Sequence, residues 1–227
     1  MYENEEVELE KPSLFGMILE PGKQFQRIKE NPKILVPFII ITVLTIIGML
    51  LMMSQIDFIG NDPELNSMSE DELMIVTIFA QIGFAITGLF APAISIVIST
   101  LIYFLIAKVV KSEVSFKQLF SMNIFIYIIS VLSLFVNALA FLAISNPDPE
   151  LYVTSLNSII QADGVLGAFL VSIEIFAIWG MILTAMGLQK VANFSKGLSW
   201  GIVIAIFVIM TGFSMASTAV LDSFGAL

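Results

Sequence analysis

The chain has 227 residues, of which 58% are hydrophobic and 13% are charged, and its formal net charge is −9. Soluble globular domains carry about 25% charged residues, and here the polar residues stand in blocks between long apolar runs, so an ordinary soluble domain is excluded. Cysteine and histidine are absent, which excludes disulfides, thiolate nucleophiles and most metal or acid–base chemistry. We therefore expect no cofactor, no metal and, without a basic stripe, no nucleic-acid partner.

The N-terminal segment is predicted to hold an acidic tail and two short helices. Residues 1–12 carry five Glu, which favours a disordered tail. Within residues 13–33, Ser13 offers an N-cap to a short apolar turn, and Pro21 suits the first position of a second helix that carries Phe25. We interpret residues 13–33 as amphipathic helices on the cytoplasmic membrane surface, with a solvated juxtamembrane linker as the alternative.

Five apolar runs follow, and each can cross a bilayer core of about 30 Å as a helix. The second run contains Pro92 and would reach about 52 Å, which raises the question of whether it is one helix or two. Its small and polar residues recur every three or four positions through Pro92, which favours one overlong, kinked helix. The predicted fold class is therefore all-α, an integral membrane five-helix bundle over residues 34–222. The predicted spans are about 34–53, 73–107, 120–144, 165–188 and 198–220.

The distribution of charge predicts the orientation of the helices. All ten Lys and Arg lie before span one, between spans two and three, or between spans four and five. The other two loops and the C-terminal tail hold ten acids and no base. Because basic residues stay in the cytoplasm, we predict a cytoplasmic N-terminus and an extracytoplasmic C-terminus. Dividing the second run into two spans would leave a mixed pattern, which supports the count of five.

Small residues indicate where the helices associate. In hydrocarbon, helices are held together by close packing of small residues and by interhelical hydrogen bonds. Span five carries Gly201 with Ala205 and Gly212 with Ala216, two pairs with the small-xxx-small spacing. Such pairs are common in membrane bundles, so they predict association without naming a partner.

Glu174 is the only acidic or basic residue inside the predicted spans, near the middle of span four. A charge at that depth costs roughly 2.5–3.5 kcal/mol. One hypothesis is a proton or cation relay, or a polar contact to a partner's helix. The other hypothesis is a neutral, hydrogen-bonded clasp that determines helix packing. We favour the clasp slightly, because a relay usually needs several ionisable groups. Asn137 on span three and Gln81 on span two are the candidate hydrogen-bond partners, chosen by residue type.

Three segments carry a resemblance: "LEPGKQFQRIKENPKILVPFII", "KSEVSFKQLFSMNIFIY" and "IEIFAIWGMILTAMGLQKVANFSKG". In their order and spacing they resemble the Yip family (Yip-one domain) of small five-span membrane proteins, and the resemblance runs from about residue 14 to the end. "LEPGKQFQRIKENPKILVPFII" is similar to the family's approach to span one, with Pro21 and Phe25 in its proline–aromatic pattern. "KSEVSFKQLFSMNIFIY" resembles the family's segment between spans two and three, with Phe116 and Lys117 at its centre. "IEIFAIWGMILTAMGLQKVANFSKG" is similar to the family's fourth span, in which an acidic residue precedes an aromatic and a tryptophan and a glycine closes the helix. Glu174, Phe176, Trp179 and Gly187 occupy those places.

The resemblance implies a role rather than a chemistry. Eukaryotic members of the family act in vesicle traffic with lipidated Rab GTPases, and some bacterial members accompany ABC-type exporters and protect the cell from antimicrobial peptides. The basic loops and the lack of a eukaryotic sorting signal favour a multi-pass protein of the bacterial plasma membrane. The motifs typical of catalysis, such as a phosphate-binding glycine loop or a nucleophile elbow, are absent, so we do not expect an enzyme.

The leading hypothesis is a non-enzymatic scaffold or accessory protein. Its expected partners are the lipid bilayer and other integral membrane proteins, either exporter subunits or further copies of itself. One alternative is a small transporter or channel that uses Glu174 and the polar helix faces. Another is a membrane-stress protein that acts on the bilayer through its N-terminal amphipathic helices.

Overall fold

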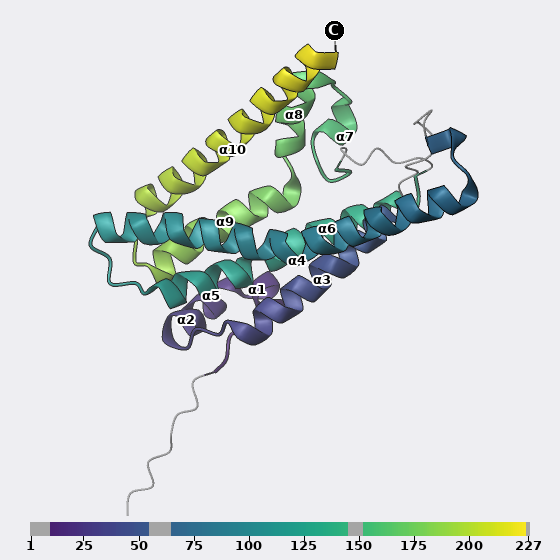
Figure 1. The fold of residues 1–227 in the computed structure, drawn as a ribbon. Helices are drawn as coiled ribbons and strands as arrows, with labels where there is room; N and C mark the ends of the chain where they lie inside the picture. The colour runs from purple at the N-terminus through teal and green to yellow at the C-terminus, as the bar shows by residue number, and fades with distance from the viewer. Residues whose placement is uncertain (1–9, 55–64, 145–151, 226–227) are drawn as a thin grey trace, which may run out of the picture.

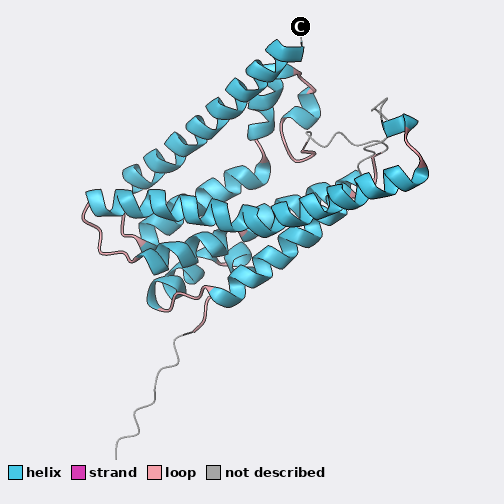
Figure 2. Cartoon of the chain, viewed as in Figure 1, coloured by secondary structure: helices cyan, strands magenta, loops and turns pink. Residues whose placement is uncertain are grey.

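The computed structural model describes residues 10–54, 65–144 and 152–225, and within these ranges the chain is helical and forms no strand. This confirms the predicted all-α class (Figures 1 and 2). Most of the predicted acidic tail and parts of both acidic loops lie outside the described residues. The helices are α1 (Leu14–Leu19), α2 (Pro21–Glu30), α3 (Leu35–Met53), α4 (Glu70–Val109), α5 (Phe116–Ile126), α6 (Ile128–Phe141), α7 (Asn157–Ile160), α8 (Gly164–Ser172), α9 (Ile175–Val191) and α10 (Lys196–Gly225), with a 3-10 turn at Leu65–Ser67.

The two N-terminal helices begin where the sequence predicts. The Ser13 hydroxyl accepts a bond from the Gly16 N–H, and Pro21 opens α2. Their environment differs from the expectation, because Met17, Phe25 and Ile28 are completely buried. These side chains pack against α5 and α9, so the apolar face of the hairpin is covered by protein. This face of the hairpin therefore packs on the bundle rather than on lipid or solvent, and the placement of residues 13–33 at the cytoplasmic membrane surface stays a prediction.

The second apolar run is one helix, as predicted. Helix α4 has 40 residues, so it is about 60 Å long, and Pro92 lies inside it. A capping box begins the helix: the Ser69 hydroxyl accepts from the Glu72 N–H, and the Glu72 carboxyl accepts from the Ser69 N–H. Its buried stripe begins only at Gly88, so the preceding turns project beyond the packed bundle.

Among the described residues, four helical segments are long and apolar enough to cross a membrane: α3, α4, the continuous pair α5–α6, and α10. Helix α3 packs against α4 and α6, and α4 also packs against α5. Helix α10 packs against α8 and α9 and diverges from α4 toward its C-terminal end (Figure 1). The helices therefore pack together around α5 and the α1–α2 hairpin, and α10 lies farther from α4 at the end where α8 and the C-terminus lie (Figure 1).

The predicted fourth span is divided into two helices. Helix α8 ends at Ser172, α9 begins at Ile175, and Glu174 between them has an extended backbone (φ −119°, ψ 139°). The prediction of one continuous helix over 165–188 is therefore wrong. Helix α9 alone has 17 residues, fewer than the roughly 20 of a usual membrane span, and α8 continues the path at an angle (Figure 1).

Candidate functional site

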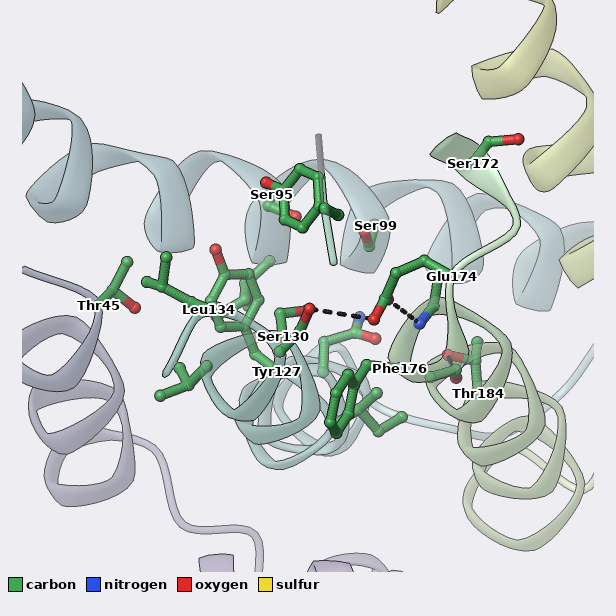
Figure 3. A pocket seen from close by; sticks show the side chains of 18 of the residues that line it. Thr45, Ser95, Ser99, Tyr127, Ser130, Leu134, Ser172, Glu174, Phe176 and Thr184 are labelled. Atoms are coloured by element: carbon green, nitrogen blue, oxygen red, sulfur yellow. Dashed lines mark hydrogen bonds between the residues drawn. The ribbon is translucent and has the colours of Figure 1, made fainter. Parts of the chain in front are cut away.

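A polar cavity of about 490 Å³ lies between α3, α4, the α5–α6 pair and α9 (Figure 3). Hydroxyl groups predominate among its polar side chains, and none of its described lining residues is basic. Polar groups at this depth are unusual because lipid cannot satisfy their hydrogen bonds. The cavity is therefore the candidate functional site. Its labelled polar residues include Ser95, Ser99, Tyr127, Ser130, Glu174 and Thr184.

Glu174 is on the cavity wall, at the break between α8 and α9. It is the N-cap of α9, and its Oε2 accepts a bond of 2.6 Å from the Ala177 N–H. The other carboxyl oxygen, Oε1, accepts from the Thr154 hydroxyl at 2.7 Å and from the Ser133 hydroxyl at 3.3 Å. The residue is only 7% exposed. Three donors from three parts of the chain thus converge on one carboxyl group.

Asn137 completes this cluster from α6. Its Nδ2 donates to the Thr154 hydroxyl at 2.9 Å and to the Ser133 hydroxyl at 3.3 Å. Its Oδ1 accepts from the Thr154 N–H at 3.3 Å. The two hydroxyls therefore accept from Asn137 and donate to Glu174. We call these four residues, Ser133, Asn137, Thr154 and Glu174, the carboxyl clasp.

The loop before α7 closes the helix break with its backbone. The Leu156 N–H donates to the Ile173 carbonyl at 2.9 Å, and the Ile175 N–H donates to the Thr154 carbonyl at 3.3 Å. Ser155 and Glu174 form an isolated antiparallel bridge. Non-helical backbone is tolerated at membrane depth only where protein or trapped water satisfies its polar groups. The loop supplies those partners, which explains how an apolar helix can be interrupted here.

The candidate partners of Glu174 have different positions in the structure. Asn137 is completely buried and belongs to the clasp, although it binds the hydroxyls rather than the carboxyl itself. Gln81 is exposed on α4 and lies 14 residues before the cavity residue Ser95, or about 21 Å along the helix. It is not a partner of Glu174, so that expectation is wrong. The side-chain partners that the sequence did not suggest are Ser133 on α6 and Thr154, and Thr154 lies in a loop where no helical pattern signals a buried contact.

Two family-motif positions meet although they are distant in sequence. A Cβ built on Gly187 would lie 2.7 Å from Met122 Sδ and 3.0 Å from Phe25 Cε1. Gly187 therefore leaves space on α9 for the Phe25 ring from α2, and Phe25 is completely buried there. Pro21 starts the helix that carries Phe25. These residues hold the N-terminal hairpin on the bundle rather than lining the cavity.

The other motif positions pack aromatic rings. Phe116 is the first residue of α5, and Lys117 follows it. The centroid of the Phe116 ring lies 5.7 Å from that of the Phe104 ring, in an edge-to-face arrangement. Phe176 and Trp179 stack on α9 with ring centroids 6.4 Å apart. Phe176 also lines the cavity, next to Glu174. The structure thus brings Glu174, Asn137 and Phe176 together and leaves Phe116, Lys117 and Gly187 outside the cavity lining.

The described residues contain no cluster of three or more acidic side chains that could hold a metal ion.

Comparison with known proteins agrees with the membrane architecture. A model of the Yip1 domain matches residues 15–218 of the chain. The chain is 34% identical over 221 residues to a protein of Bacillus subtilis (strain 168) named membrane protein YknW, covering 96% of this chain and 94% of the relative. No solved structure matches.

Proposed function

The chain belongs to the Yip1-domain family, and from that premise we propose that it is a non-enzymatic membrane protein that assembles with other integral membrane proteins through α10. It is a multi-pass membrane protein in contact with lipid. The charge distribution supports a cytoplasmic N-terminus in a bacterial plasma membrane.

The observation that carries the proposal is an uncovered stripe of small residues on α10. Gly201, Ala205, Gly212 and Ala216 are separated by 4, 7 and 4 residues, so they lie on one face of the helix, and all four are exposed. A Cβ built on either glycine meets no atom within 4 Å. Helix α10 uses a different face, with Ile202 and Val203, to pack within the chain.

Glycines elsewhere in the bundle show what such residues do when a neighbour is present. A Cβ on Gly48 would lie 2.7 Å from Leu134, and one on Gly88 would lie 2.9 Å from the Ile46 backbone. These glycines allow close approach between helices of the same chain. Because close packing is the main force between helices in lipid, the stripe on α10 fits a helix of another membrane protein. The partner class expected from the family resemblance is an ABC-type exporter, and a second copy of this chain is the other candidate.

Assembly can be tested by copurification from the native membrane after mild crosslinking. We expect the tagged full-length protein to recover an exporter subunit or a second copy in a fixed ratio. The variants Gly201→Leu and Gly212→Leu should lower that recovery severalfold because a leucine separates the two helices. Gly83→Leu is the matched control, since Gly83 is also exposed with nothing within 4 Å but lies on α4. Equal losses from all three variants, or recovery of the protein alone, would contradict the proposal.

A second candidate function, a small transporter or channel, is favoured by the hydroxyl-lined cavity beside Glu174. The carboxyl clasp argues against Glu174 as a relay, because its carboxyl already accepts three hydrogen bonds from the chain. Solute flux into liposomes that contain only the purified protein would support transport and would overturn the assembly proposal as the primary role. Absence of flux, together with recovery of a partner, would support assembly.

A further inference from the structure

An apolar groove of about 710 Å³ runs between the start of α1 and the start of α3. Pro12, Leu14 and Phe15 form one side, while Leu35, Val36 and Ile40 form the other. The buried ring of Phe125 on α5 lies at its base. Pockets that hold small apolar ligands usually enclose about 300–1,000 Å³, so this groove has the capacity of a ligand site.

The walls of the groove are unusually exposed. Leu35 is 70% exposed, Phe15 69% and Val36 66%. In water such a surface would be costly, whereas in a bilayer a hydrocarbon chain can cover it. The groove therefore fits an acyl chain.

The polar end of the groove is basic. Lys11 and Lys33 both line it, and none of its described lining residues is acidic. Neither lysine forms an ion pair with another described residue, whereas Lys23 and Arg27 nearby are paired with Glu20 and Glu10. The Lys33 carbonyl accepts a bond of 2.7 Å from the Ser121 hydroxyl, which fixes the backbone that carries this lysine. Two cations thus stand beside an acyl-sized apolar surface.

We propose that this groove binds one anionic phospholipid, with an acyl chain along α1 and α3 and the phosphate between Lys11 and Lys33. Charge complementarity selects the anionic class, because a zwitterionic lipid would bring a third cation close to the two lysine ammonium groups. The predicted topology places both lysines at the cytoplasmic leaflet, where anionic lipids attract basic residues near a membrane surface. The site is separate from the α10 stripe and from the cavity, so it does not depend on either proposed function.

The proposal can be tested with the full-length protein reconstituted in phosphatidylcholine nanodiscs that contain phosphatidylglycerol. Native mass spectrometry after mild detergent extraction would then measure which lipid stays bound. We expect phosphatidylglycerol to be retained in preference to phosphatidylcholine. Lys11→Ala and Lys33→Ala should each weaken that binding about fivefold, the effect of one basic residue near the headgroup. Lys196→Ala is the control, because this exposed lysine at the start of α10 lies outside the groove.

A second pair of variants tests the acyl chain. Val36→Trp fills the groove and should remove bound phosphatidylglycerol, whereas Ile39→Trp, at an exposed position on the same helix outside the groove lining, should not. Soluble glycerol phosphate should fail to displace the lipid because it lacks an acyl chain. Thermal unfolding of each variant checks that it is folded, and all of these positions lie at the surface or the groove rim.

Several outcomes would overturn the proposal. Equal retention of the two lipids, or equal loss in the Lys11, Lys33 and Lys196 variants, would show that the lysines do not select the headgroup. Displacement by glycerol phosphate would show that the apolar groove contributes nothing. A change of oligomeric state in Val36→Trp without loss of lipid would identify a second copy as the occupant. Removal of residues 2–9, which carry four Glu, should maintain or strengthen lipid binding, and loss of binding would identify this tail as part of the site.

Discussion

The Thr154 hydroxyl donates a hydrogen bond of 2.7 Å to the Glu174 carboxyl, and this bond connects the loop before α7 to the break between α8 and α9. The two residues are 20 positions apart, and the loop backbone bonds on both sides of Glu174. A buried acid that looks isolated in the sequence is thus held by a segment outside the predicted spans. The helix break, the loop and the wall of the cavity depend on this contact.

Removal of the Glu174 carboxyl should destabilise the protein more than its conversion to an amide. Glu174→Ala leaves the Ser133 and Thr154 hydroxyls and the Ala177 N–H without an acceptor, at a cost of about 1–3 kcal/mol for each buried group left unsatisfied. Glu174→Gln keeps an oxygen for the Ala177 N–H, and its amide can donate to hydroxyls that rotate. Thermal unfolding of purified protein in detergent measures the difference. An unchanged unfolding midpoint in Glu174→Ala, together with loss of solute flux into liposomes in both variants, would instead support a relay.

Gly187→Leu should displace the N-terminal hairpin. A side chain at this position overlaps Met122 and Phe25, so α2 must move away from α9. We expect hydrogen exchange in α2 to become faster, because the α2 residues Phe25 and Ile28 lose their buried positions. Gly83→Leu provides the comparison, since a Cβ there meets nothing within 4 Å. Unchanged protection of α2 in Gly187→Leu would show that the hairpin does not depend on this contact.

Gly88→Ala should weaken the contact between α3 and α4. The added Cβ would lie 2.9 Å from the Ile46 Cα, and a backbone atom cannot move aside as a flexible side chain can. Overpacking of this kind costs about 1–3 kcal/mol. Gly83→Ala on the exposed part of the same helix should be neutral or slightly stabilising, because alanine is the better helix former. The unfolding midpoint of Gly88→Ala should therefore be lower than that of Gly83→Ala. Equal midpoints would contradict the tight α3–α4 contact.

The topology can be checked with single cysteines, because the chain has none of its own. Asp71, Glu113, Ser195 and Ser223 are exposed in the structure and lie in or beside four different connections or ends. We expect an impermeant thiol reagent applied to intact cells to label Asp71→Cys and Ser223→Cys, and to label Glu113→Cys and Ser195→Cys only after the membrane is opened. Labelling of Glu113→Cys in intact cells would contradict a cytoplasmic connection between α4 and α5.

Several elements of the fold could be predicted because their signals are local. The bounds of α3 follow from an uncharged apolar run, and Ser13 and Pro21 begin helices through their own side chains. The continuity of α4 through Pro92 follows from the spacing of small and polar residues on one helical face. Glu174 is also evident from the sequence, because no other charged residue lies inside the predicted spans. Each of these inferences uses residues within a few turns of one another.

The tertiary structure decided what those elements contact. The amphipathic pattern of α2 does not distinguish a membrane surface from a protein surface, and only the space at Gly187 shows that Phe25 docks on α9. The break before α9 has no glycine or proline to signal it, since the sequence there is Ser172, Ile173 and Glu174. It is stable because a distant loop supplies hydrogen bonds that a helix would otherwise make within itself. Composition and periodicity thus determined an all-α membrane protein with one carboxyl inside its predicted spans, while contacts between distant segments determined where that carboxyl lies and which groups hold it.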